Sequence, residues 1–270
     1  MSAELTAAQV VRIVQDEIRG NGHQWFEPTV DVFKAGDPDQ VVTGVGSTWM
    51  STSYAIDAAS RLGCNFLITH EPTFWNHLDK HYDWYADDAT YRAKSDLIAG
   101  TSMTIWRLHD NIHMGFDPDP ILSAFLDKVT IAGGTRGSSG FTWQGEVLEM
   151  TLRQFAEHVA RCLGTTSVRY VGDPDLPVRK VGLGAHNLDT ALDANRGADA
   201  VIMGETREWD TFEYYRDATL LGVPRGLVVI SHRDLETWGS TVFANWLAPR
   251  LTGLPVVQIE SLPPFTIVTD

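Results

Sequence analysis

Short apolar segments that alternate with helical patterns are the feature that most limits how this chain can fold. The clearest segment is Phe66-Leu67-Ile68, which is apolar on both faces, as is typical of parallel strands covered by helices. We expect further strands at 41–45, 103–108, within 141–149, and at 178–183, 200–203, 227–230 and 256–259. We expect helices at 5–19, 51–62, 87–98, 118–126, from a cap at Thr151 to Gly164, and at 188–195, 207–220 and 233–247. This alternation predicts an α/β fold.

An internal repeat predicts two related halves. Residues 45–75 and 181–209 share a strand–helix–strand pattern, and Glu205 and Trp209 follow Glu71 and Trp75 at the same offset of 134 positions. Chance similarity between two βαβ segments is the alternative. We expect halves at 1–132 and 133–270 that pack as one intertwined unit, with mixed, largely parallel sheets flanked by helices. Residues 133–140, rich in Gly and Ser, are the best candidate for a linker. The strand-end loops of both halves are expected to approach one cleft.

The overall charge excludes some classes of partner. Asp and Glu outnumber Lys and Arg by 35 to 21, so the net charge is −14, which argues against binding to nucleic acid or to an anionic membrane. Cys64 and Cys162 are the only cysteines and form no metal-binding or redox motif. The N-terminal residues lack the pattern of a signal peptide, and no apolar run approaches 18 residues. We therefore expect a soluble cytoplasmic protein that acts on a small molecule.

Three segments carry side chains that can bind metal ions. His70 and Glu71 end the strand that begins at Phe66, and Pro72 follows them. A second group ends the strand at 103–108, and a third begins the helix after the strand at 227–230. Since the carboxyl ends of parallel strands meet at one edge of a sheet, all three segments should project to the same edge. The second and third groups are His109, Asp110 and His113, and His232 with Glu236.

The chemistry of these side chains favours transition metals. The set contains imidazoles and carboxylates but no thiolate, which suits Zn, Mn, Fe, Co or Ni better than Ca or Mg. More than four such ligands can hold two ions, with a carboxylate such as Glu236 bridging them. A two-metal centre can generate hydroxide near neutral pH and polarise the bond under attack. For His232 and Glu236 taken alone, a solvated helix face is the commoner explanation.

The same three segments resemble motifs of the Nif-three-like family, also called dinuclear-metal-centre hexameric proteins. The family pattern contains Ile-Thr-His-His-Pro, His-Thr-Asn-Leu-Asp and Gly-His-Tyr-x-x-Glu, and the likeness covers about residues 40–260 in the same order. Some members are described as type 2 GTP cyclohydrolase I. The resemblance implies a ring-shaped homo-hexamer, a trimer of dimers with metal sites facing an internal cavity. The corresponding segments here are 68–72, 109–113 and 231–236, and 171–174 and 204–205 also match.

Two positions depart from the family pattern. The second His of the family's pair is Glu71 here, and the family's middle Asp ligand is His113. These changes exchange a His and a carboxylate, so the total remains three imidazoles and two carboxylates. We therefore expect a two-metal centre in the cleft between the halves, holding two divalent ions of Zn, Fe, Mn or Co. Its predicted ligands are His70, Glu71, His113, His232 and Glu236.

Other residues are candidates for roles near this centre. His109 is a candidate catalytic residue or an outer partner of a ligand, and Asp110 borders the substrate pocket. The repeat makes Glu205 a candidate general base, with a plain surface carboxylate as the alternative. Trp75 and Trp209 could line a pocket for a flat substrate, although packing is the commoner role for tryptophan. No partner is evident for His23, His158 or His186.

Two functions are consistent with these residues. The first is a dinuclear-metal-dependent hydrolase, in which metal-bound hydroxide attacks an electrophilic carbon of an amide or cyclic amidine and cleaves a C–N bond. The second is a non-catalytic protein for metal storage, delivery or regulation. The open, Trp-rich loop favours the hydrolase, because a storage site need not be open to substrate. Nucleotide binding through Gly182-Leu183-Gly184 is a weaker third, because the later Gly of a dinucleotide fingerprint is missing.

Overall fold

A computed structural model describes residues 4–137 and 140–268. The chain forms two compact units. Unit 1 comprises residues 1–121 and 239–262, and unit 2 comprises residues 122–238 and 263–270. The predicted boundary lies at 132/133, whereas residues 239–262 return to unit 1.

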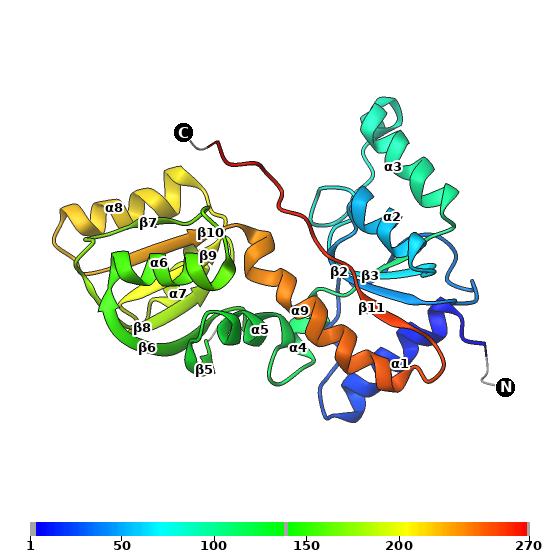
Figure 1. The fold of residues 1–270 in the computed structure, drawn as a ribbon, viewed down its shortest axis with the longest axis horizontal. Coiled ribbons are helices and arrows are strands. Elements are labelled where there is room, and N and C mark those ends of the chain that lie inside the picture. Colours follow the sequence, from blue (N-terminus) through cyan, green and yellow to red (C-terminus); the bar gives the residue numbers. More distant parts are fainter. Residues whose placement is uncertain (1–3, 138–139, 269–270) are drawn as a thin grey trace. The chain divides into compact units, whose positions relative to one another are not determined.

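Unit 1 is built on a five-stranded sheet in the order β1-β4-β3-β2-β11 (Figure 1). Strands β2, β3, β4 and β11 pair in parallel, and only β1 is antiparallel to its neighbour. Buried side chains from α2 and from strands β3 and β4, among them Ile56, Leu67 and Ile105, form a hydrophobic core on one face of the sheet. The strands are β1 (Phe33–Ala35), β2 (Val45–Met50), β3 (Phe66–Glu71), β4 (Thr104–Arg107) and β11 (Val256–Gln258). The helices of the N-terminal segment are α1 (Ala7–Gly20), α2 (Ser53–Arg61), α3 (Ala89–Gly100), α4 (Asp110–Met114) and α5 (Pro120–Lys128), with a 3-10 turn at Asp83–Asp87.

Unit 2 is built on a six-stranded sheet in the order β5-β6-β8-β9-β10-β7 (Figure 1). Its centre, β8-β9-β10, is parallel, and the outer strands are antiparallel. Every residue of β9 and β10 is buried, which explains why both read as continuous apolar runs. The strands are β5 (Ala132–Arg136), β6 (Trp143–Thr151), β7 (Arg169–Val171), β8 (Pro177–Gly184), β9 (Ala200–Gly204) and β10 (Gly226–Ile230). The helical elements of unit 2 are α6 (Leu152–Leu163), α7 (Leu188–Ala194), a π-helical turn at Glu208–Phe212 and α8 (Glu213–Leu220). Helix α9 (His232–Leu247) begins in unit 2 and ends in unit 1, which also includes a 3-10 turn at Ala248–Arg250.

The α/β class and the two helix-flanked sheets confirm the predicted fold. The proposed repeat corresponds to two parallel βαβ elements, β2-α2-β3 in unit 1 and β8-α7-β9 in unit 2. Thr151 caps α6 through a capping box with Gln154, and Gly164 ends the helix in the left-handed conformation. The predicted position of the metal site in a cleft between the halves stays a prediction.

The strand predicted at 41–45 was wrong, because β2 begins only at Val45 and extends to Met50. The polar residues Ser47 and Thr48 made β2 hard to predict from the sequence, since polar residues are not expected in a buried strand. Their hydroxyls are satisfied within unit 1: Ser47 donates to the carbonyl of Ser240, and Thr48 lies 3.2 Å from the Ser261 hydroxyl.

The linker predicted at 133–140 was also wrong for residues 133–136, which belong to the exposed edge strand β5. Gly134 lets the Trp143 ring pack closely against β5, because a Cβ at this position would lie 2.8 Å from the ring. Residues 138 and 139 of that segment lie outside the described residues. The predicted helix at 207–220 is likewise divided into the π-helical turn and α8.

Gly182 and Gly184, considered above for nucleotide binding, serve the packing of α7 on β8. A Cβ on Gly182 would lie 2.3 Å from the Ala194 carbonyl oxygen, and one on Gly184 would lie 3.2 Å from that of Thr190. The glycines therefore let the helix approach the sheet closely.

We expect Gly182→Ala to lower the free energy of unfolding by about 2 kcal/mol, because a methyl group forced against backbone must displace the helix. The matched control is Gly100→Ala at the end of α3, where a Cβ meets nothing within 4 Å. That change should leave stability equal or slightly higher. Urea unfolding of both variants makes the comparison, and equal midpoints for the two would contradict this account of Gly182.

Candidate metal centre

In unit 1, two adjacent parallel strands deliver the metal-capable side chains to one edge of the sheet. Strand β3 ends with His70 and Glu71, and both are buried. Strand β4 pairs with it in register, so that Thr69 lies opposite Arg107, and His109 follows two residues later. The short helix α4 then turns back and places His113 in the same region. The predicted convergence of the first two segments is thus confirmed within unit 1.

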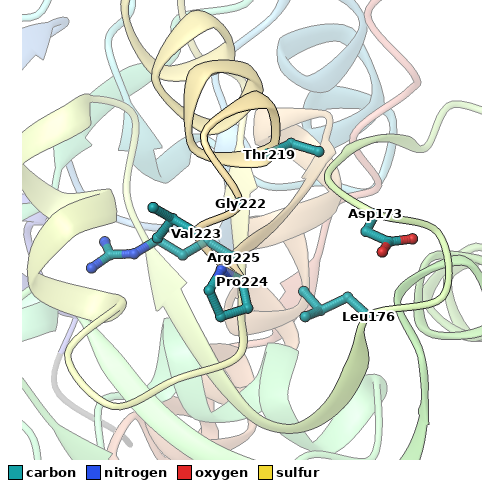
Figure 2. Close-up of a pocket in the computed structure, with 7 residues that line it drawn as sticks. All are labelled: Asp173, Leu176, Thr219, Gly222, Val223, Pro224 and Arg225. Carbon is teal, nitrogen blue, oxygen red and sulfur yellow. The ribbon is translucent and has the colours of Figure 1, made fainter.

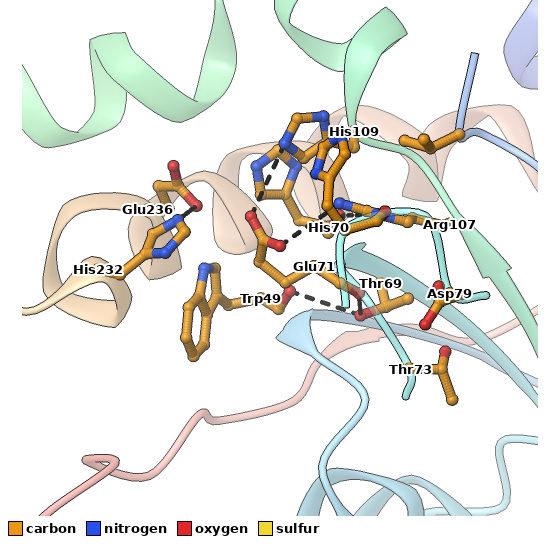
Figure 3. A network of polar contacts seen from close by, with 12 residues as sticks. Trp49, Thr69, His70, Glu71, Thr73, Asp79, Arg107, His109, His232 and Glu236 are labelled. Atoms are coloured by element: carbon orange, nitrogen blue, oxygen red, sulfur yellow. Dashed lines mark hydrogen bonds and ion pairs between the residues drawn. The ribbon is translucent and has the colours of Figure 1, made fainter. Parts of the chain in front are cut away.

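His70, His109 and His113 form a compact cluster. One ring nitrogen of each lies within 4.8 Å of the others. The rings of His70 and His109 stack on each other (Figure 3), with their centroids 4.7 Å apart. The His113 ring meets their edges at centroid distances of 5.0 and 5.5 Å. Such an arrangement places imidazole nitrogens around a common point.

A hydrogen bond to Nδ1 orients each ring of the cluster. Nδ1 of His70 lies 3.2 Å from the Leu108 carbonyl oxygen, which can only accept, so this nitrogen carries the proton. Nδ1 of His109 lies 2.9 Å from a carboxylate oxygen of Asp110, and Nδ1 of His113 lies 2.8 Å from one of Asp119. In this tautomer the lone pair is on Nε2, as in metal-binding histidines whose other nitrogen is held by an outer acceptor.

The protonation states fit a metal-binding role. Burial lowers the pKa of His109, so its ring is neutral at neutral pH. For Asp110, burial alone would raise the pKa. Hydrogen bonds from His109, from the Val30 amide and from the Thr29 hydroxyl outweigh it and hold that pKa below its usual range. Asp110 is therefore a charged outer partner of His109, and its predicted role at a substrate pocket stays a prediction.

Asp31 fixes the backbone that carries this cluster. Its carboxylate accepts from the amide groups of His109, Asp110 and Asn111 at 2.6, 3.0 and 2.7 Å. These are amide groups at the start of α4, which would otherwise lack partners. The contact between Asp31 and α4 could not be predicted from the sequence, because Asp31 lies in a segment without periodicity, far from α4 in sequence. The contact of Asp119 could not be predicted for a similar reason, because nothing in the sequence pairs it with His113.

Glu71 is in contact with a permanent cation. The Arg107 side chain is fully buried, and its Nη2 lies 3.4 Å from Glu71 Oε2. Arg107 also donates to the carbonyl oxygens of His70 and His77. The other oxygen of Glu71 lies 3.7 Å from Nε2 of His109, so the carboxylate lies between Arg107 and His109 (Figure 3). Glu71 thus lies beside the cluster while also serving as the counter-ion of a buried guanidinium.

In unit 2, three consecutive parallel strands end beside one another. His186 follows the end of β8, Glu205 follows β9 directly, and His232 begins α9 just after β10. Nε2 of His232 lies 2.7 Å from Glu236, as predicted for positions four apart on a helix (Figure 3). His186 lies 3.4 Å from the other oxygen of Glu236. One ligand atom each of His186, His232 and Glu236 lies within 4.8 Å of the others.

His186 is not among the predicted site residues. It nevertheless lies near the carboxyl end of a parallel strand, as the other candidate residues do. It follows an apolar strand that runs parallel to the strand before Glu205. The predicted strand ended at residue 183, three positions before His186, which concealed the relation.

Glu205 has an unusual backbone for a non-glycine residue, with φ of 30°. Strained conformations of this kind occur often at functional sites. Its carboxylate lies 3.2 Å from Nδ1 of His232, and its side chain is 65% exposed. The residue is therefore placed to orient His232 and to meet a ligand from solvent, and its role as a general base stays a prediction.

Trp75 lies in a loop that the rest of unit 1 holds firmly. Its φ is 60°, its ring lies 5.1 Å from the Nζ of the buried Lys94, and it remains 47% exposed. Burial lowers the pKa of Lys94 to about 8, and its ammonium group donates to the carbonyl of Thr73. His77, two residues after Trp75, contacts the His109 ring, with ring centroids 5.4 Å apart.

In unit 2, Trp209 is 73% exposed and packs on Arg207. A substrate-binding role for either tryptophan stays a prediction.

Two cavities in the structure lie apart from these histidines. One of about 150 Å³ in unit 2 is lined by residues that include Asp173 and Arg225, and the Arg225 guanidinium points away from Asp173 (Figure 2). The other, of about 540 Å³ in unit 1, lies between α3 and the loop after β1 and is lined in part by Phe74 and Tyr91. Neither is lined by a metal-capable histidine, whereas a small cavity of about 10 Å³ in unit 1 is lined in part by His70.

The predicted five-ligand set is divided between the units. His70, Glu71 and His113 belong to unit 1, and His232 and Glu236 belong to unit 2. His109 lies with the first group, and its predicted catalytic role stays a prediction. A single centre formed by all five residues stays a prediction.

None of the helices in the described part of the chain has the length and apolar character that crossing a bilayer requires.

The solved structures that resemble this chain share its fold. The crystal structure of Staphylococcus aureus hypothetical protein SA1388 matches with a TM-score of 0.77 and 17% identity, covering 97% of this chain and 99% of the other. A Bacillus cereus protein related to NIF3 matches with a TM-score of 0.74 and 15% identity, covering 99% and 100%.

Sequence comparisons agree with the structural ones. A protein of Clostridium acetobutylicum named GTP cyclohydrolase 1 type 2 homolog is 25% identical over 228 residues, which are 74% of this chain and 79% of that protein. The family model Duf34/NIF3 (NGG1p interacting factor 3) matches residues 30–263, a span that contains both histidine groups. The chain therefore belongs to the Duf34/NIF3 family.

Proposed function

We propose that this protein is a metal-dependent hydrolase that cleaves a C–N bond in a small molecule and uses divalent transition metal ions held by the histidine groups described above. The observation that carries the proposal is the orientation of His70, His109 and His113. Each has an acceptor at Nδ1, and their rings gather at one point. Ordinary buried histidines need no such convergence, whereas metal-binding histidines do.

The donor sets of both units fit transition metal ions. Unit 1 offers three imidazoles beside the Glu71 carboxylate, and unit 2 offers His186, His232 and Glu236. Nitrogen-rich sets of this kind suit Zn, Fe or Co better than Ca or Mg, which prefer oxygen ligands. Two ions per chain would be consistent with the dinuclear centre expected from the family resemblance.

In the proposed reaction, the bound ion, Glu205 and Trp75 have different roles. A bound ion would act as a Lewis acid and lower the pKa of a water molecule in its shell toward neutrality. Glu205, exposed and bent away from ordinary strand geometry, is placed to accept a proton from water or to hold a polar group of the substrate. The exposed face of Trp75 is available to stack on a planar substrate, and Lys94 supports its ring.

The name of the Clostridium relative supports the proposal that the bond hydrolysed is a C–N bond. That protein is named GTP cyclohydrolase 1 type 2 homolog, and a cyclohydrolase opens a ring by hydrolysis at C–N bonds. The substrate of the present protein is not transferred from that name, because Glu71 and His113 exchange ligand types relative to the family pattern.

Replacement of one histidine in each unit tests the metal sites. We expect His113→Ala and His232→Ala each to bind less metal than the parent protein after reconstitution with Zn²⁺ or Co²⁺, and to lose hydrolysis of cyclic amide and amidine substrates. Mass spectrometry gives the metal content per chain. His23→Ala, outside both groups, is the control and should match the parent protein. Full metal content in both site variants would refute the assignment, whereas metal retention without any turnover by the parent protein would favour metal storage.

The outer carboxylates should matter almost as much as the ligands. We expect Asp119→Ala to weaken metal affinity about 10- to 100-fold, because the His113 ring loses the acceptor that holds it. Competition with a chromophoric chelator measures this affinity. Asp127→Ala, an exposed position on α5, is the matched control. An Asp119 variant with unchanged affinity would show that the bond to His113 serves packing alone.

A further inference from the structure

We infer that the cavity of about 540 Å³ in unit 1 is a second ligand site, which binds a small aromatic carboxylate through the buried ammonium group of Lys34. The cavity lies between α3 and the loop after β1, and none of the described residues that line it belongs to the histidine groups. The site is therefore separate from the residues of the proposed hydrolase, and its test does not depend on that activity.

The cavity has the size and the lining of a small-molecule pocket. Such pockets usually measure about 300–1,000 Å³ and are lined mainly by apolar and aromatic side chains, with a few polar groups that fix the ligand. The rings of Phe74 and Tyr91 lie side by side, with centroids 4.8 Å apart and planes tilted by 42°, so a flat aromatic group can pack against both. The apolar lining residues are Ala35, Phe74, Tyr91, Ile98, Ala99 and Met103.

Lys34 is the buried charged residue of this lining. Its side chain is only 7% exposed, and the one polar contact of its ammonium group among the described residues is Asp79, whose Oδ2 lies 3.5 Å from Nζ. An ammonium group has three donors, so Lys34 retains donors for a ligand. Asp37, the other charged residue of the lining, is exposed, and its carboxylate accepts from the Asp39 amide at 2.9 Å. The positive charge is thus buried, whereas the negative one faces solvent.

An irregularity in the pairing of β1 places Lys34. This residue is the extra one between Phe33 and Ala35, because their partners in β4, Trp106 and Ile105, are adjacent to each other. Such a bulge interrupts the regular alternation of side chains, and bulges often re-aim a side chain beside a functional site. The bulge explains how a lysine of an edge strand has its side chain buried beside the cavity instead of extended into solvent.

The charges around Lys34 favour an anionic ligand. Asp79 also attracts the ammonium group of the buried Lys94, so two buried lysines share one carboxylate, and these three groups carry an excess of one positive charge. Burial lowers the pKa of both lysines, because a buried ammonium group loses its hydration. The charges of Arg107 and Asp31 act on Lys34 in opposite directions. A ligand with one negative charge would balance the excess and accept hydrogen bonds from Lys34.

A carboxylate fits this cavity better than a phosphate does. One buried ammonium group and one excess charge match a monoanion, whereas phosphate groups are usually held by arginine side chains or by several backbone amide groups. No arginine is among the described residues that line the cavity. The apolar wall also requires an apolar body on the ligand, which an aromatic acid provides.

Isothermal titration calorimetry of the full-length protein with 2-naphthoate tests the inference. The matched neutral probe is 2-naphthamide, which has the same ring system without the charge. We expect saturable binding of 2-naphthoate and at least about tenfold weaker binding of the amide, because the buried ammonium group pairs only with the carboxylate. No saturable binding of 2-naphthoate, or equal affinity for the two probes, would overturn the inference without the use of any variant.

Variants of the cavity locate the bound probe. Lys34→Met, which removes the charge but keeps a long side chain, should bind 2-naphthoate at least about tenfold more weakly. Lys80→Met, at an exposed position outside the lining, should match the parent protein. Ala99→Trp should fill the cavity and abolish binding, whereas Ala93→Trp, exposed on the same helix but outside the lining, should not. Unchanged binding in both Lys34→Met and Ala99→Trp would overturn the inference.

A third variant separates this cavity from the candidate metal centre, because a carboxylate can also bind a metal ion. His113→Ala should leave the affinity for 2-naphthoate unchanged. Loss of binding in this variant, together with full binding in Lys34→Met, would assign the probe to the metal centre. That result would overturn the inference while it supported metal binding by the histidines, so failure of the second site and failure of the proposed function are distinguishable.

Discussion

Parallel pairing in register is the constraint on which both candidate sites depend. In unit 1 the ends of β3 and β4 deliver His70 and the segment beginning at His109, and in unit 2 the ends of β8, β9 and β10 deliver His186, Glu205 and His232. Side chains distant in sequence become neighbours because their strands end at the same edge. The buried apolar strands form the hydrophobic layers, and the polar side chains lie at the strand ends or just beyond them.

Much of this arrangement could be predicted because strand ends are visible in sequence. Apolar runs such as 66–68 and 227–230 are bounded by abrupt changes to polar residues, so the candidate ligand positions beside them could be predicted. The strand at Val45–Met50 was misplaced because its buried hydroxyls find partners at Ser240 and Ser261, which no local pattern reveals. His186 was missed because a short connection separates it from its strand.

The outer partners of the histidines could not be predicted for a different reason. Asp31, Asp110 and Asp119 contact the same cluster, yet they come from a nonperiodic loop, a helix start and the segment before α5. Only Asp110 was considered, since it adjoins His109 in sequence. The pairing of Glu71 with the buried Arg107 is similar, because Arg107 reads in sequence as part of an apolar strand end. The candidate ligands could therefore be predicted from local sequence order, whereas the hydrogen-bond partners of each histidine depend on tertiary structure.

The buried Arg107 and the carboxylates of unit 1 have an electrostatic consequence. Asp31, Asp110, Asp119 and Glu71 supply four carboxylates around the histidine cluster, and Arg107 supplies one positive charge, which leaves an excess of three negative charges among these five groups. A divalent cation would reduce that excess to one, so the cluster resembles an ion receptor whose counter-charge is built in. A bound cation would relieve the repulsion among these carboxylates, so ion binding to unit 1 would be thermodynamically linked to its folding. Metal supply in the cell would then determine how much of the protein is folded as well as how much of it is active.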